Sequence, residues 1–264
     1  MKANKYIPSL FLFLFVFSMA ASGQSLIAVV DYMKLNPNFD GDYVEVEKSW
    51  KKIHEARQAE GILHSWTLYR VMFTGVDSPY DYVTVNFYTD MGKLENSFPQ
   101  EIIQKAYPDM KDDEIEKMMQ KTGASRELLK SEVFFQRLVT DTANQGKFIV
   151  VNRMNVVNVT GPEYVQMERE IYKPLHDESV RMGLRSGWSV WNKWPGDYRD
   201  FNFVTVDSYK SLSQMVSNNQ PLFKSVHPDK DPLQVEKDTD RIRDWVSAEI
   251  WQYVDGVPPV ETGQ

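Results

Sequence analysis

The sequence predicts an α+β fold in which two copies of one unit, strand–helix–strand–strand–helix–strand, form a barrel within a single chain. Two observations predict it: the second half of the chain repeats the first, and each half shows the same succession of apolar periods. A third observation concerns composition. The chain has 264 residues, of which 42% are hydrophobic and 25% charged, and it contains no cysteine. This composition is typical of a globular protein and excludes thiol catalysis and thiolate metal sites.

The internal repeat is seen when residues 43–88 are placed over residues 164–209. The matched pairs are Tyr43 and Tyr164, Glu47 and Glu168, Trp50 and Tyr172, His54 and His176, Gly61 and Gly183, and Trp66 and Trp188. The second copy carries one inserted residue before Tyr172, and from each histidine onward the spacing is identical. Agreement of so many large residues in one order indicates a duplicated domain.

The repeat divides the chain into two domains. Residues 26–140 form the first repeat and residues 146–255 the second, and the polar segment 141–146 links them. Residues 256–264 form a C-terminal tail. Two such units in one chain can bury their open sheet faces against each other. Because this pairing is satisfied within the chain, we expect a monomer.

Each copy begins with a strand rich in Ile and Val and continues with a helix in which apolar residues recur at helical spacing. In the second copy a capping box, Thr160 with Glu163, begins the helix, and Pro174 is expected to kink it. Gly61 and Gly183 are expected to end the helices in the left-handed conformation. Two strands joined by a turn follow, then a helical region and a last strand. The expected strands are 26–33, 65–72, 82–87 and 132–138, and then 147–154, 187–193, 201–206 and 249–254.

The N-terminus has the pattern of a secretory signal peptide, which we assign to residues 1–23. Lys2 and Lys5 precede an apolar run at residues 10–17, and small residues lead to an expected cleavage before Gln24. An uncleaved anchor is the alternative. The run is too short to span a bilayer, and no later stretch approaches a spanning helix. We therefore expect a secreted or periplasmic protein with no stable membrane association after cleavage.

The charge balance narrows the range of partners. The net charge is −7, and removal of residues 1–23 with their two lysines would change it to −9. An acidic surface repels nucleic-acid phosphates and anionic lipid. We therefore expect no nucleic-acid partner, and a small molecule as the ligand.

The element order resembles the dimeric α+β barrel superfamily of ferredoxin-like proteins, in a form where one chain supplies both halves. That superfamily includes the antibiotic-biosynthesis monooxygenases, the NIPSNAP proteins and the haem-degrading monooxygenases. Residues 151–154 (Val-Asn-Arg-Met) resemble the first strand of the haem-degrading members, in which an Asn faces the cavity. Residues 222–227 (Leu-Phe-Lys-Ser-Val-His) resemble their second helix, in which the His is the proximal iron ligand. The resemblance implies that Asn152 faces a cavity and that His227 ligates the iron if haem binds.

Two departures from that pattern bear on the site. The haem-degrading enzymes carry a Trp near the end of the third strand, where this chain has Asp207. In the first copy, Asp31 and Tyr107 stand where the second copy has Asn152 and His227. We therefore expect any site to lie in the second copy.

Strand alternation also favours the second copy. If Val204 and Val206 pack against the helices, then Thr205 and Asp207 point into the cavity between the two sheets, where Asn152 joins them. A few polar groups among aromatic side chains are what a small-molecule pocket needs. The expected ligand-binding residues are Asn152, Trp188, Thr205, Asp207 and His227, and the candidates for catalysis are His227, Asn152 and Asp207.

The histidines leave alternatives open. His227 can ligate iron or move protons near neutral pH, or it can instead cap its helix before Pro228. His54 and His176 either mark twin sites or support the strands that follow them. The chain has no HExxH motif, so spacing predicts no metal site apart from haem at His227.

Three functions are consistent with these observations. The first is an exported barrel that binds a small hydrophobic or aromatic ligand in the cavity of the second repeat. The second is a cofactor-free or haem-dependent enzyme of the monooxygenase type, dependent on His227 and Asn152. The third is a non-catalytic interaction module with a filled barrel and no cavity.

Overall fold

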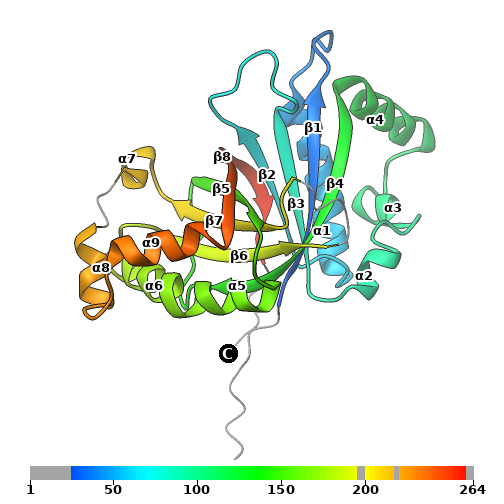
Figure 1. The fold of residues 1–264 in the computed structure, drawn as a ribbon. Coiled ribbons are helices and arrows are strands. Elements are labelled where there is room, and N and C mark those ends of the chain that lie inside the picture. The colour runs from blue at the N-terminus through cyan, green and yellow to red at the C-terminus, as the bar shows by residue number, and fades with distance from the viewer. Residues whose placement is uncertain (1–24, 195–199, 217–219, 260–264) are drawn as a thin grey trace, which may run out of the picture.

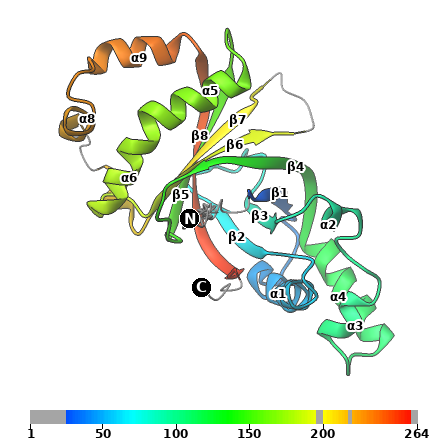
Figure 2. The same cartoon turned by 90° about the horizontal axis from the view of Figure 1, so that it is seen from below.

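The structure, a computed structural model, describes residues 25–194, 200–216 and 220–259, so the expected signal peptide at residues 1–23 lies outside the described residues. Eight antiparallel strands form a closed barrel, and the helices cover its outside in two groups (Figures 1 and 2). The predicted α+β barrel is confirmed. Among the described residues, no helix combines the length and apolar character needed to cross a bilayer.

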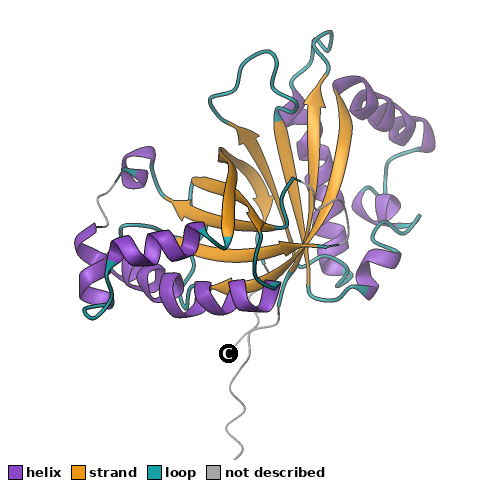
Figure 3. Cartoon of the chain, in the orientation of Figure 1, coloured by secondary structure: helices purple, strands orange, loops and turns teal. Residues whose placement is uncertain are grey.

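Both halves contain the expected succession of elements (Figure 3). The first half consists of β1 (Ile27–Leu35), α1 (Tyr43–Ala59), β2 (Ser65–Val71), β3 (Tyr82–Tyr88), α2 (Gly92–Glu95), α3 (Ile102–Ala106), α4 (Asp112–Ser125) and β4 (Arg126–Val139). The second consists of β5 (Phe148–Val156), α5 (Gly161–Met167), the π-helix η1 (Glu168–Tyr172), α6 (Lys173–Arg181), β6 (Gly187–Lys193), β7 (Phe203–Tyr209), α7 (Leu212–Met215), α8 (Gln220–Val226), α9 (Pro232–Asp240) and β8 (Arg243–Val257).

The strand order around the barrel is β1-β3-β2-β8-β5-β7-β6-β4. Each half therefore has the same internal order, with its last strand beside its first. The long strands β4 and β8 close the barrel, because β4 pairs with both β1 and β6, and β8 pairs with both β5 and β2.

These two strands begin earlier than the sequence predicts, at Arg126 and Arg243 instead of residues 132 and 249. The reason is a β-bulge in each, where the register against the neighbouring strand shifts and leaves Leu129 or Val246 as the extra residue. A bulge interrupts the alternation of apolar and polar residues from which a strand is recognised.

Helix ends follow the local sequence as predicted. The Thr160 hydroxyl caps α5 and the Glu163 carboxylate returns to the Thr160 backbone, which completes the capping box. Gly61 and Gly183 follow the two long helical segments with φ of +67° and +74°, a conformation that favours glycine.

The one-residue insertion in the second copy has a structural counterpart. It falls within η1, where the helix widens to a π-turn for Glu168–Tyr172 directly before α6. Pro174, which was expected to kink this helix, lies in the first turn of α6. A π-turn accommodates one extra residue without ending the helix, so helices α5 and α6 run on as one irregular rod (Figure 1).

The core has three parts, and their placement corrects one expectation. An apolar cluster fills the barrel and includes Val204, with Val206 packed against it, whereas two further clusters lie between the sheet and the two helix groups. The prediction that Val204 and Val206 face the helices is wrong, and Thr205 and Asp207 point toward α6 instead of into the barrel. One face of this sheet is covered by the barrel core and the other by the helices, so the presence of a valine does not show which face it is on. The apolar side chains of β7 point into the closed interior of the barrel.

Candidate functional site

The structure brings three of the predicted site residues together beneath the helices of the second half. The amide of Asn152 on β5 donates to Thr205 Oγ1 at 3.2 Å and to Asp207 Oδ2 at 2.9 Å, both on β7. Asn152 and Thr205 are buried. The three side chains thus form one hydrogen-bonded row on the outer face of the barrel.

Arg185, which precedes β6, holds this row from the side. Its Nη1 donates to Asp207 Oδ1 and its Nε to Ser179 Oγ at 3.3 Å, and its side chain is only 7% exposed. Burial raises the pKa of the Asp207 carboxyl, and the Arg185 charge opposes that rise. Among the described residues, Arg185 Nη2 has no hydrogen-bond partner.

Trp188 is buried on β6, where the ring of His176 stacks on it with 4.4 Å between centroids and 25° between planes. Burial, together with the positive charges of Arg185 and Arg243, holds the pKa of His176 well below its usual value of 6.5. His176 is therefore neutral at pH 7.

The first half makes the same arrangement with the acid and the amide exchanged. Asn86 on β3 donates to Asp31 Oδ2 on β1 at 3.1 Å, in the places of Asp207 and Asn152. His54 stacks on Trp66 at 4.7 Å, as His176 does on Trp188. Each half therefore places one carboxylate, one amide and one stacked histidine beneath its helices.

The guanidinium of the first half comes from another position and closes the space. Arg57 is fully buried, and it donates to Asn86 Oδ1 at 3.0 Å, to Tyr88 Oη at 2.5 Å and to the Ser97 carbonyl at 2.8 Å. It also lies 3.8 Å from the centre of the Phe98 ring.

The second half has a hollow at the corresponding place. Ser179 occupies the position that matches Arg57, three residues after the stacked histidine, and it is too small to fill the space. The hollow has a volume of about 570 Å³ and opens between α6, α8 and α9. Its apolar walls are Leu175, Leu222, Phe223 and Leu233, its polar walls are His176, Ser179 and Arg185, and Glu236 stands at its exposed rim.

Each half also contains a second buried carboxylate, and in both halves it forms an ion pair with an arginine. Glu168 on η1 forms an ion pair with Arg243 at the start of β8, and Glu47 on α1 does so with Arg126 at the start of β4. Burial raises the pKa of both carboxyls, and the arginines oppose the rise. The pairs fasten each long helix to the last strand of its own half.

His227 lies apart from the predicted row. Its Nε2 donates to the carbonyl of Ile171 in η1 at 2.8 Å, which ties the end of α8 to the π-helix. In the first half the Tyr107 hydroxyl donates to the carbonyl of Ser49 at 2.9 Å. Ser49 and Ile171 precede the matched residues Trp50 and Tyr172, so His227 and Tyr107 make equivalent contacts. His227 thereby positions α8, which carries two walls of the hollow.

These residues do not fit haem, the cofactor that the resemblance implied. The Nε2 atom that would ligate iron is already a hydrogen-bond donor, and His227 does not line the hollow. A tyrosine makes the same contact in the first half, which indicates a structural role for the pair. Within the described residues, no group of three or more His, Asp or Glu side chains is placed to hold a metal ion.

The comparisons with known proteins give the fold and no closer assignment. No protein-family model matches the chain, and no curated protein matches it in sequence. The structure is similar to a proposed monooxygenase from Fusobacterium nucleatum, at 13% identity over 89% of this chain and 94% of that one with a TM-score of 0.52. It is also similar to a proposed monooxygenase from Lactobacillus acidophilus, at 10% identity over 90% and 98% with a TM-score of 0.52. A proposed chlorite dismutase matches at 10% identity over 88% and 95%, with a TM-score of 0.50.

These likenesses show a shared barrel fold. The sequence prediction did not include Arg185 or Ser179. The signal for Ser179 was present, because a serine stands opposite Arg57 in the alignment of the two copies. Arg185 has no such signal, because Leu63 stands at the matching place in the first half.

Proposed function

We propose that the protein binds one small molecule in the hollow of its second half, and that this molecule has an apolar body and a hydrogen-bond acceptor. The observation that carries the proposal is the difference between the halves. In the first half Arg57 and Phe98 fill the space below the helices, whereas in the second half the corresponding space stays open.

The walls support this class of ligand. Pockets for small molecules are mostly apolar, with a few polar groups that orient the ligand, and have volumes of roughly 300–1,000 Å³. The hollow, at about 570 Å³, falls within that range. Leucine and phenylalanine side chains would cover the body of the ligand, and Arg185 Nη2 would donate to its acceptor. The interaction-module alternative predicts a molecule without a cavity, so the hollow favours ligand binding over it.

We also propose that the chain is a tandem duplication of a ferredoxin-like unit, with repeats at 26–140 and 146–255, the linker 141–146 and the tail 256–264. Contacts that occur once in each half support the duplication, such as the stacking of His54 on Trp66 and of His176 on Trp188. We propose further that the protein is exported after loss of residues 1–23 to a secreted or periplasmic location, and that it is a monomer. The denatured mass of the purified protein tests the cleavage, and its native mass tests the oligomeric state.

A monooxygenase-type activity without a bound cofactor is the second candidate. Two structural neighbours carry that proposed activity in their names. The residue that bears on it here is His176, because its neutral imidazole lies on the wall of the hollow and can accept a hydrogen bond from a phenolic substrate. Oxygen uptake in the presence of candidate phenolic substrates, lost in His176→Phe, would support this activity. The absence of uptake would leave binding alone.

Fluorescence titration with 1-anilinonaphthalene-8-sulfonate tests the binding proposal, because this probe joins an apolar body to an acceptor. Leu222→Trp adds bulk to the hollow wall, and we expect it to weaken binding of the probe at least tenfold. Leu129→Trp makes the same change at an exposed position of the first half and should leave binding unchanged. Equal binding by all three proteins would overturn the proposal.

A further inference from the structure

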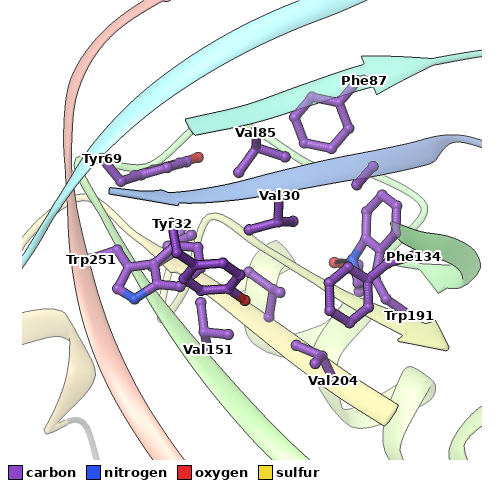
Figure 4. Close-up of a pocket in the computed structure, with 14 residues that line it drawn as sticks. Val30, Tyr32, Tyr69, Val85, Phe87, Phe134, Val151, Trp191, Val204 and Trp251 are labelled. Carbon is purple, nitrogen blue, oxygen red and sulfur yellow. Dashed lines mark hydrogen bonds between the residues drawn. The ribbon is translucent and has the colours of Figure 1, made fainter. Parts of the chain in front are cut away.

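A second, separate cavity lies inside the barrel. It has a volume of about 140 Å³ and is lined by inward-facing side chains from strands of both halves (Figure 4). Six of its fourteen wall residues are aromatic, namely Tyr32, Tyr69, Phe87, Phe134, Trp191 and Trp251. Most of the others are valines, among them Val30, Val85, Val151 and Val204. We call this space the barrel chamber.

The polar atoms of the chamber walls are already engaged. Trp191 Nε1 donates to Ser189 Oγ at 2.7 Å, and Trp251 Nε1 donates to Glu249 Oε2 at 2.8 Å. Within the part of the chain that the structure describes, none of the buried side-chain atoms without a hydrogen-bond partner belongs to a wall residue. A water molecule in the chamber would lack the two to four polar partners that it needs, so the chamber favours apolar contents.

Ionic side chains lie at one end of the barrel, beyond Tyr32 and Trp251. Arg153 Nη1 lies 2.7 Å from Glu249 Oε1, and the Tyr80 hydroxyl donates to the same carboxylate at 2.6 Å. Lys193 and Glu132 form a second buried pair at 2.8 Å. These pairs place charged and hydrogen-bonded groups at this end of the barrel.

The opposite end leads outward. A third space, which we call the outer hollow, has a volume of about 470 Å³ and lies at the barrel mouth. It shares five wall residues with the chamber, which are Tyr69, Phe87, Ser189, Trp191 and Val206. The chamber is therefore an apolar space that adjoins the outer hollow.

We propose that the barrel chamber binds a small aromatic hydrocarbon of about the size of benzene, independently of the hollow in the second half. Size supports this, because an engineered apolar cavity of about 150 Å³ stays dry and binds benzene or xenon. The walls support it too. Aromatic rings attract one another edge to face, and Tyr32 and Trp251 already meet in this way, with planes at 83°.

Benzene is the probe for the test, with thermal unfolding and tryptophan fluorescence as readouts. At a concentration ten times its dissociation constant, it should raise the midpoint of unfolding by roughly 3–6 °C. It should also change the emission of Trp191 and Trp251. Val151→Phe fills the chamber and should abolish both responses. Val71→Phe adds the same bulk to the barrel core away from the chamber walls, and it should preserve them.

No response of the wild-type protein to benzene would overturn the proposal, as would a response that survives Val151→Phe. If Val151→Phe does not fold, crystals of the wild-type protein under xenon pressure decide the question. Xenon density inside the barrel is the expected result. Density only at the outer hollow, or none at all, would refute the chamber as a binding site.

Discussion

The exchanged acid and amide in the two halves lead to a prediction about charge placement. In the second half Asp207 carries the charge that balances Arg185, and in the first half Asp31 lies near Arg57. Asp207→Asn leaves the Arg185 guanidinium, whose side chain is 7% exposed, without its carboxylate. Removing one partner of a buried ion pair costs about 3–5 kcal/mol.

Adding Asn152→Asp to that variant moves the carboxylate across to β5 and reproduces the arrangement of the first half. There Arg57 Nη1 donates to an amide oxygen, Asn86 Oδ1, at 3.0 Å. We therefore expect the double variant to recover more than half of the lost stability. The free energy of unfolding of the wild-type protein, both single variants and the double variant is measured by urea denaturation at pH 7. Single-variant effects that add to within about 0.5 kcal/mol would refute the equivalence of the two clusters.

Three further predictions concern stability. The folded protein holds the pKa of His54 well below 6.5, chiefly by burial and then by the charge of Arg57. As the pH falls below 6.5, only the unfolded chain takes up a proton at this position, so the folded protein loses stability. His54→Gln should reduce this loss by up to about 1.4 kcal/mol per pH unit between pH 7 and 5, measured as the free energy of unfolding in urea. Glu168→Gln leaves Arg243 unpaired and should cost about 3 kcal/mol by the same assay, and a cost below about 1 kcal/mol would contradict a buried pair. Gly183→Ala meets no atom within 4 Å but keeps φ at +74°, so backbone strain alone should cost about 1–2 kcal/mol, and an unchanged thermal midpoint would argue against it.

Much of the architecture could be predicted from the sequence, because the repeat shows the same signals twice. The positions of His54 and His176 relative to the next Trp are identical, and in both halves the two rings stack. Long bulged strands were the weaker part of the prediction. At Leu129 and Val246 the alternation of apolar and polar residues is lost, so a pattern of period two cannot follow the strand through them.

The orientation of the strands could not be read from local pattern. Val204 and Thr205 alternate clearly, but the sequence does not say whether the barrel or the helices receive the valine. That depends on barrel closure through the β2–β8 and β4–β6 pairs, which join residues far apart in the chain. The polar side chains then face the helices, where Arg185 supplies a charged partner.

The sequence predicted a cluster of polar residues but not the hollow, because none of the five expected ligand-binding residues lines it. Asn152, Thr205 and Asp207 do lie together, because neighbouring positions on paired strands follow from register. His227 does not join them, because the helical region that carries it ends against η1, and that contact depends on tertiary packing. The hollow itself lies beside position 179, where a serine stands in place of the arginine at position 57.

The central claim is that the hollow of the second half holds a small molecule, and native mass spectrometry tests it most directly. The protein is purified gently from the cells that make it, and its native mass is compared with its denatured mass. We predict an excess mass that is lost on denaturation, that is retained by Leu129→Trp and that is absent from Leu222→Trp. An excess that persists in Leu222→Trp would contradict the claim, and so would a bare native mass in a protein that also fails to bind the anilinonaphthalene probe.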